Sequence, residues 1–246
     1  MIPMTRSRWV ASAACATLWV AALSVGCADR IKPLDPTETH YGMTYAEWGV
    51  AWWEWFYETP CTPGPTPLES TGYPVLDTTG EFCAVGQSGD VWFLAGITQP
   101  VAVERTCTIP AGKAIFFPFL NTTYDNACNP DMSTWLTPDE LRDEATRSQD
   151  SAVDLYVILD GEEIPHPERY RAGPSELGYD LPPIGMNVYN CLGVTDCGGT
   201  VDPSFSDGYW MMFEPLPPGE HTLHFGGRVT YPGDYTSDIT YHLTVE

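Results

Sequence analysis

The sequence predicts a mainly β protein, an antiparallel β-sandwich that carries two short helices. Three observations support this fold class. Short apolar or alternating segments recur between proline- and glycine-rich stretches along the 246 residues. Helical periodicity behind a capping box occurs at two places, residues 44–60 and 137–148. The chain closes with two alternating segments joined by a Pro-Pro-Gly-Glu turn, which predicts a hairpin.

An export signal is predicted over residues 1–26. Arg6 and Arg8 precede a long apolar run that ends in Leu-Ser-Val-Gly before Cys27. Small residues directly before a cysteine are typical of a bacterial lipoprotein cleavage site, so we expect Cys27 to be lipidated. Ordinary cleavage nearby, or an uncleaved anchor, is the alternative.

After the signal, the sequence predicts a tether followed by a single domain. Residues 27–41 are polar and contain proline, as expected for a lipidated N-terminus and tether, and residues 42–246 suit a single β-sandwich domain. The predicted location is the bacterial cell envelope, as an outer-membrane lipoprotein facing the periplasm or the exterior.

The charge balance restricts the partners. Eleven basic residues stand against 33 acidic ones, a net charge of −22. Such a surface repels nucleic acid and anionic lipid, so no nucleic-acid partner is expected, and membrane contact is expected only through the lipid anchor. Calcium binding would explain the acids, but no EF-hand-type loop is present. No cofactor is predicted, and a glycan or an envelope protein is the expected partner.

The cysteines predict disulfides. An even number of them follows Cys27, as is common in exported proteins: Cys61, Cys83, Cys107, Cys128, Cys191 and Cys197. The connectivity is open. We expect Cys191–Cys197 to close a local loop, with Cys83–Cys107 and Cys61–Cys128 as the remaining pairs. Zinc binding is the rival interpretation, but no C-x-x-C pair exists.

The first helix begins with a capping box, Thr44 and Glu47, and ends before Pro60. Aromatic side chains recur every three or four residues and predict one wide buried face: Tyr45, Trp48, Trp52, Trp55 and Phe56. The three tryptophans of this set are expected to anchor the helix on a sheet.

Two aromatic residues flank that face. Trp53 and Tyr57 are expected to stay accessible and to serve as a ligand platform, with incidental exposure as the alternative. Acids lie on the opposite face. Glu47 and Glu54 lie about 10 Å apart along the helix, close to the roughly 6.5–9.5 Å between the carboxyls of inverting glycosidases. Because Glu47 caps the helix, a solvated face explains these acids better.

The later elements follow from local patterns. Strands are predicted at 90–97, 101–109, 113–121, 153–164, 208–216, 221–229 and 238–246. Pro118 indicates an edge or a bulge. A second capping box at Thr137 and Glu140 predicts a short helix over 138–148. Residues 165–206 are predicted to be irregular.

The irregular region is the best predicted ligand site. It carries aromatic, amide and charged side chains between prolines and glycines: Tyr170, Arg171, Tyr179, Tyr189 and Asn190. Long loops on a rigid sandwich often carry function, and such side chains suit sugar rings. The alternative is a disulfide-bonded loop that only covers a sheet edge.

A metal site is a further hypothesis. If Phe225 faced Tyr241 across the closing hairpin, His224 would face His242 and the two imidazoles could share a metal ion. Two surface histidines on a polar face are the alternative, and a register slip of one residue would remove the pairing.

Several sequence blocks carry a resemblance. The W-x3-W-W-x-W helix, "GQSGDVWFLAG", "CTIPAGKAIFFPFLN" and "DGYWMMFEPLPPGEHTLHFGG" resemble a set of uncharacterised bacterial secreted proteins or lipoproteins. This resemblance implies an exported single domain and no particular activity. The closing hairpin resembles the last two strands of immunoglobulin-like sandwiches, and a jelly-roll-like sandwich is equally compatible.

These observations favour an exported, lipid-anchored protein that binds a glycan or a protein partner at the cell envelope. The alternative is an exported hydrolase acting on carbohydrate or a cell-wall polymer, and a structural envelope protein is a third class. Convergent carboxylates with shifted pKa values in a pocket would favour the enzyme. Aromatic contacts without such acids would favour binding.

Overall fold

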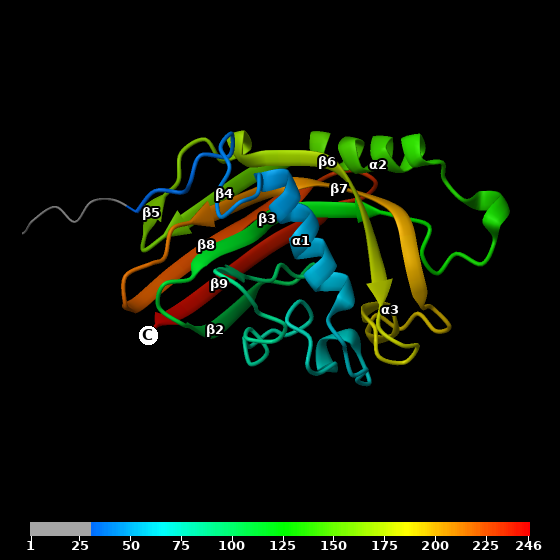
Figure 1. Cartoon of the computed structure of the whole chain (residues 1–246), viewed down its shortest axis with the longest axis horizontal. Coiled ribbons are helices and arrows are strands. Elements are labelled where there is room, and N and C mark those ends of the chain that lie inside the picture. The colour runs from blue at the N-terminus through cyan, green and yellow to red at the C-terminus, as the bar shows by residue number, and fades with distance from the viewer. Residues whose placement is uncertain (1–30) are drawn as a thin grey trace, which may run out of the picture. The chain divides into compact units, whose positions relative to one another are not determined.

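The computed structural model describes residues 31–246, which form one compact unit. Two sheets build a β-sandwich, which confirms the predicted fold class (Figure 1). The helices are α1 (Tyr45–Glu58), α2 (Pro138–Asp150) and α3 (Val188–Cys191). The strands are β1 (Val91–Phe93), β2 (Val103–Ile109), β3 (Ala114–Tyr124), β4 (Val153–Leu159), β5 (Glu162–Glu163), β6 (Arg171–Leu181), β7 (Gly199–Phe213), β8 (Gly219–Val229) and β9 (Tyr235–Val245).

The strand order is β1-β3-β7-β6 in one sheet and β2-β9-β8-β4-β5 in the other. Most neighbouring strands are antiparallel, as predicted, but β1 runs parallel to β3 and β2 runs parallel to β9. Strands β1 and β2 are both edge strands. Neither is joined by a hairpin to the strand it pairs with, so no tight turn requires an antiparallel pairing.

The four-stranded sheet is covered on both faces. Phe117 of β3 and Met211 of β7 belong to the core between the two sheets. The neighbouring Phe116 and Trp210 belong to a second core cluster beneath α1, and their rings stack with centroids 5.4 Å apart. Side chains alternate along a strand, so β3 and β7 need apolar residues at consecutive positions. This explains the continuous apolar runs of these two segments.

Helix α1 lies across the outer face of the four-stranded sheet (Figure 1). Its capping box is present as predicted. Trp52 and Trp55 are buried, and each donates its indole N–H to a backbone carbonyl outside the helix. Trp48 is only partly buried. The expectation that Trp53 and Tyr57 stay accessible is wrong, because both are buried, at 7% and 5% exposure.

One of the three predicted disulfides is confirmed, Cys83–Cys107. The other two expectations, Cys191–Cys197 and Cys61–Cys128, are wrong: the bonds are Cys61–Cys191 and Cys128–Cys197. Each of these bonds joins the 187–197 loop to a distant segment, over sequence separations of 130 and 69 residues, so the pairing follows from tertiary packing and not from local spacing. Within the loop, the Asn187 side-chain amide donates to the carbonyl of Cys197 at 2.8 Å.

The predicted irregular region is more ordered than expected. It contains β6, the short helix α3 and the first part of β7. Strand β6 was not predictable from alternation because its pairing with β7 shifts register twice, first between Ala172 and Ser175 and again between Leu177 and Tyr179. Gly173 and Pro174 lie at the first irregularity. Pro118 lies at a register shift within β3, as predicted.

Part of the predicted tether belongs to the folded domain. Pro33 forms a β-bridge with Phe213, and the backbone N–H of Leu34 donates to the carbonyl of Met212. The domain therefore begins before residue 42, the predicted boundary. The predicted signal peptide and Cys27 lie outside the described residues.

Candidate functional site

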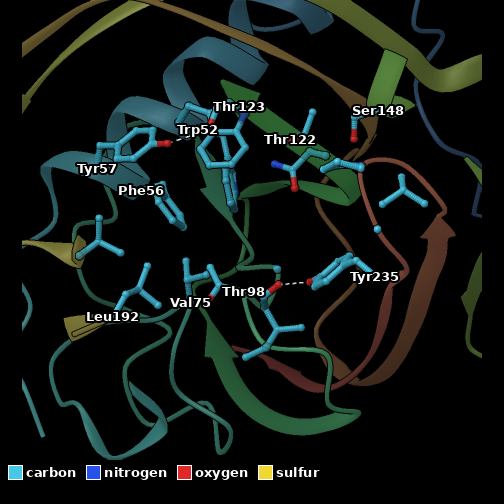
Figure 2. Close-up of a pocket in the computed structure, with 18 of the residues that line it drawn as sticks. Trp52, Phe56, Tyr57, Val75, Thr98, Thr122, Thr123, Ser148, Leu192 and Tyr235 are labelled. Carbon is cyan, nitrogen blue, oxygen red and sulfur yellow. Dashed lines mark hydrogen bonds between the residues drawn. The ribbon is translucent and has the colours of Figure 1, made fainter. Parts of the chain in front are cut away.

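A cavity of about 480 Å³ lies beside the C-terminal half of α1 (Figure 2). We call it the aromatic cavity. Its lining comes from α1, β3, the segment after β1, the β8–β9 turn and the α3 region: Trp52, Trp53, Phe56, Tyr57, Val75, Gly96, Ile97, Thr98, Asn121, Thr122, Thr123, Ser148, Val188, Tyr189, Leu192, Val229, Tyr231, Pro232, Gly233, Asp234 and Tyr235. Residues 232–234 are exposed, so the β8–β9 turn marks the side open to solvent.

The cavity exists because β1 is short. Strand β1 pairs with β3 only as far as Phe116, and the chain after Phe93 leaves the sheet within two residues. In the part of the chain that the structure describes, no other strand pairs with this edge of β3. Asn121, Thr122 and Thr123 therefore lie along an uncovered strand edge, and the departing segment 96–98 forms the opposite side (Figure 2).

The α1 wall consists of stacked rings. Trp52 stacks with Phe56 at a centroid distance of 5.7 Å, and Trp53 stacks with Tyr57 at 5.6 Å. Residues four positions apart lie on the same side of a helix, so each pair presents adjacent rings. Such rings offer apolar faces to a ligand together with a few polar atoms.

Three buried polar atoms of the lining have no hydrogen-bond partner: Trp53 Nε1, Thr98 Oγ1 and Asn121 Nδ2. An unsatisfied buried group costs about 1–3 kcal/mol, so each needs an explanation. The three atoms belong to three separate elements, α1, the 96–98 segment and β3. All three atoms are shielded from solvent, so a molecule in the cavity would reach them only after the surrounding side chains moved.

The interior of the cavity is uncharged. Its lining, as the described residues define it, contains no Lys, Arg or His, and its one carboxylate is Asp234. That side chain is 76% exposed and forms an ion pair with Arg228 at 3.2 Å. Burial raises the pKa of Tyr57 and of Tyr235, so both hydroxyls stay protonated at neutral pH.

A tyrosine cluster supports the wall from behind. The hydroxyls of Tyr179, Tyr189 and Tyr57 donate to Asp125 Oδ2 at 2.8, 3.1 and 3.4 Å. Tyr57 also shares a 2.6 Å hydrogen bond with Thr123, and its ring stacks on Tyr179 at a centroid distance of 3.7 Å. These bonds fix the orientation of two of the tyrosines that line the cavity, Tyr57 and Tyr189.

The structure brings together part of the predicted ligand set. Trp53, Tyr57 and Tyr189 line the cavity, and Tyr179 lies directly behind Tyr57. Thr98, Asn121 and Asp125 were missed, since nothing in a local pattern distinguishes one threonine, asparagine or aspartate from the others. Their importance comes from the tertiary arrangement.

The other predicted ligand residues have structural contacts elsewhere. Arg171 forms ion pairs at 2.7 Å with Asp207 and with Asp150, which ties β6 to β7 and to the end of α2. Tyr170 packs against Tyr45. Asn190 completes the capping box of α3. None of Tyr170, Arg171 and Asn190 lines the aromatic cavity.

The hairpin register assumed for the metal site is wrong. Phe225 pairs with Ile239, not Tyr241, so His224 faces Thr240 and His242 faces Thr222. His224 contacts Asp238 at 2.8 Å, whereas His242 lies 3.9 Å from Glu104. Within residues 31–246, no group of three or more His, Cys, Asp or Glu side chains could hold a metal ion.

A second hollow lies beside the other flank of α1. We call it the acidic cleft. It has a volume of about 540 Å³, and its lining includes Trp48, Glu54, Trp55, Glu58 and Asp90. Burial, followed by the nearby Glu58 charge, raises the pKa of Glu54. Glu47 is not part of it, and hydrogen bonds from Thr44 lower the Glu47 pKa, as its capping position requires.

No protein-family model, no curated protein and no solved structure matches the chain. The fold and the site therefore define its class: a disulfide-bonded β-sandwich with an aromatic cavity under one helix. Three disulfides are typical of an extracytoplasmic protein. Among the described helices, none is long and apolar enough to cross a membrane.

Proposed function

We propose that the chain is an exported envelope protein that binds a small glycan reversibly in the aromatic cavity. The observation that carries this proposal is a lining that combines stacked aromatic rings on α1 with hydroxyl and amide side chains such as Thr98, Asn121 and Thr122. Sugars have hydroxyl and ring oxygens that accept hydrogen bonds, and C–H faces that pack on aromatic rings.

The size of the site supports the same proposal. A volume of about 480 Å³ lies within the roughly 300–1,000 Å³ of small-molecule sites. Hydroxyl and amide side chains come from several elements of the lining, among them Thr98, Asn121 and Ser148, and this arrangement suits a polyhydroxylated ring.

The location is part of the proposal. The signal-like segment 1–26 and the cysteine at position 27 support export and lipid attachment at the outer membrane, and the disulfides support an oxidising compartment. An anchored domain with a cavity could hold glycan fragments at the envelope. This placement agrees with the resemblance to secreted bacterial proteins.

One variant tests the proposal directly. Trp53→Phe replaces the indole of the cavity wall with a smaller ring. Screening the purified protein on a glycan array, followed by calorimetry with the sugars that bind, should show affinity about three- to tenfold lower for the variant, because part of the aromatic contact face is lost.

A matched control is available. Trp92 is as buried as Trp53, at 7% exposure, and its Nε1 is also unpartnered, but it belongs to the core between the sheets and not to the cavity. Trp92→Phe should leave glycan affinity unchanged. Equal losses in both variants, or no binding of any glycan by the wild-type protein, would reject the proposal.

A hydrolase is the second candidate, favoured by the raised pKa of Glu54 in the acidic cleft. A protonated carboxyl could act as a general acid on a glycosidic oxygen. Incubation with cell-wall polymer and chromatography of the products tests it. Cleavage by the wild-type protein that Glu54→Gln abolishes would place the activity in this cleft.

A further inference from the structure

We infer that a third hollow, beside the loop between β3 and α2, docks a basic segment of a partner protein that carries apolar side chains. We call this hollow the outer groove. It has a volume of about 470 Å³, and its lining includes Trp135, Leu136, Leu181, Asp196 and Asp202. No residue lines both the outer groove and the aromatic cavity, so this inference goes beyond the proposed glycan site.

Large apolar side chains are exposed together on this loop, which projects beyond the sheets (Figure 1). Met132, Trp135 and Leu136 are 71%, 46% and 37% exposed. Of the tryptophans within residues 31–246, only Trp135 is exposed. Single exposed apolar residues are ordinary, but a group of them beside a groove is typical of a binding surface, where tryptophan often contributes much of the affinity.

The segment on the other side of the groove adds further apolar surface. Ile184 is exposed and lies against Gly198, where an added Cβ would come within 2.8 Å of the Ile184 Cγ1 atom. Gly198, Val201 and Pro203 line the groove. An aliphatic or aromatic side chain of a partner therefore finds apolar contacts on both segments.

Hydrogen bonds and a disulfide hold the exposed loop in place. The Asn126 side chain forms two hydrogen bonds at 2.9 Å with the backbone N–H and carbonyl of Leu136. The Trp135 indole N–H donates to the carbonyl of Asn129 at 3.0 Å, and the Cys128–Cys197 bond joins the two segments that line the groove. A surface that is ordered in advance loses less conformational entropy when a partner binds.

The charges of the groove determine which partner fits. Asp196 and Asp202 are exposed, and they are the only charged side chains of the lining within the described chain. Neither carboxylate has an ion-pair or hydrogen-bond partner among residues 31–246. Arg142 of α2 already pairs with Asp139 at 2.7 Å. Lysine or arginine beside an apolar residue of a partner would pair with the two free carboxylates.

The same charges disfavour two other occupants. A second copy of the chain would bring the same carboxylates and a net charge of −22, so the two copies would repel each other. An anionic membrane surface would be repelled as well. A basic protein segment is the occupant that satisfies both the exposed apolar side chains and the free carboxylates.

The test is a selection of random short peptides, displayed on phage, against the purified protein. The enriched peptides are synthesised with a fluorescent label, and their affinity is measured by fluorescence anisotropy. They should combine an aliphatic or aromatic residue with neighbouring lysine or arginine. Their affinity should fall as salt is raised, because exposed ion pairs are screened.

One variant tests the apolar anchor. Trp135→Ala should weaken binding of the enriched peptides by at least about tenfold, because it removes the exposed ring at the groove. Tyr41→Ala is the matched control, since Tyr41 is 41% exposed and lies outside the groove. Its peptide affinity should equal that of the wild-type protein. Thermal melts of both variants show whether the fold is retained.

A second variant tests the charges. Replacing both Asp196 and Asp202 by Asn keeps the apolar surface and should weaken the peptides by about three- to tenfold, with a smaller dependence on salt. Glu38→Gln combined with Glu81→Gln is the control, because it removes the same charge from exposed positions outside the groove. This control should change affinity by less than about twofold.

Enrichment of acidic or uncharged peptides, or of no peptide, would overturn the inference. Wild-type affinity in a folded Trp135→Ala variant would also overturn it. Flotation with phosphatidylcholine vesicles and sedimentation velocity test the other occupants. Vesicle binding or a dimer that Trp135→Ala abolishes would assign the groove to a membrane or to a second copy instead. None of these results depends on glycan binding in the aromatic cavity.

Discussion

The two hollows beside α1 are similar in size and differ in how their tryptophans are satisfied. In the acidic cleft, Trp48 and Trp55 donate their indole N–H groups to the carbonyls of His40 and Val85, at 2.8 and 3.0 Å. In the aromatic cavity, Trp53 Nε1 has no partner among the described residues. Volume does not distinguish the two places. An unpartnered indole does not by itself mark a ligand site either, because Trp92 Nε1 in the core between the sheets is also unpartnered.

The hollows also differ in charge. The acidic cleft contains Glu54, Glu58 and Asp90, whereas the cavity lining contains one exposed carboxylate. One helix thus separates a polar acidic surface from an aromatic interior. The comparison teaches that the two sides of α1 offer a ligand different chemistry, aromatic rings on one side and carboxylates on the other.

The largest expected effect comes from truncating the cavity wall. Trp53→Ala should lower the free energy of unfolding by about 3–5 kcal/mol and reduce glycan affinity by more than about a hundredfold, because it removes both a stacking face and a donor. Urea denaturation and calorimetry measure the two quantities separately.

The Trp55→Ala variant tests whether the ligand binds in the aromatic cavity and not in the acidic cleft. Trp55 is also buried in α1, at 9% exposure, but it faces the acidic cleft. We expect a comparable loss of stability and an affinity within about twofold of wild type. If Trp55→Ala abolished binding and Trp53→Ala did not, the ligand would belong in the acidic cleft.

The disulfides give an intermediate effect. Cys61–Cys191 anchors α3, which contributes Val188 and Tyr189 to the cavity, whereas Cys83–Cys107 lies away from it. Replacing both Cys61 and Cys191 by Ala should cost about 3–5 kcal/mol of stability, since the bond closes a loop of 130 residues. Affinity should fall about tenfold as α3 loosens.

The double replacement of Cys83 and Cys107 by Ala is the matched control. This bond closes a shorter loop of 24 residues, so we expect a smaller loss of stability, about 2–4 kcal/mol, and unchanged affinity. Thermal melts and calorimetry on both double variants provide the comparison. Equal affinity in the two variants would show that the position of α3 does not matter for binding.

The elements that the sequence predicts well are those defined by local chemistry. Helix α1 begins at a capping box, and the β8–β9 hairpin alternates cleanly, so both follow from neighbouring residues. Strand β6 does not, because Gly173 and Pro174 interrupt its alternation where the register shifts. The disulfide pairing does not either, because Cys61–Cys191 and Cys128–Cys197 join residues 130 and 69 positions apart in the sequence.

The sequence predicted only part of the candidate site. Trp53 and Tyr57 were selected as accessible aromatics and Tyr189 as a side chain of the irregular region, but Trp53 and Tyr57 are buried and line the cavity space. That space forms because β1 ends at Phe93 and leaves an edge of β3 uncovered. Strand length and register depend on the packing of the whole sheet, so the residues of one segment do not show them. The lack of hydrogen-bond partners for Asn121 Nδ2 and Thr98 Oγ1 depends on the same packing.

The smallest expected effect is the pH dependence of protein stability caused by Glu54 in the acidic cleft. Burial and Glu58 raise the pKa of Glu54 in the folded protein above its ordinary 4.5. The folded state therefore binds a proton more tightly than the unfolded state, and this contribution to stability is lost as pH rises through the folded pKa. Glu54→Gln should stabilise the protein at pH 7 by a few tenths of a kcal/mol, because solvent screens this half-open site.

Urea denaturation of wild type and Glu54→Gln at about pH 4 and pH 7 measures this difference, which should be present at the higher pH and absent at the lower. Glu38→Gln, an exposed carboxylate outside both hollows, should show no such gain. Glycan affinity should be the same in all three proteins. A loss of stability at pH 7 in Glu54→Gln would mean that the ionised Glu54 has a favourable partner, and the acidic cleft would then become the stronger candidate for a functional site.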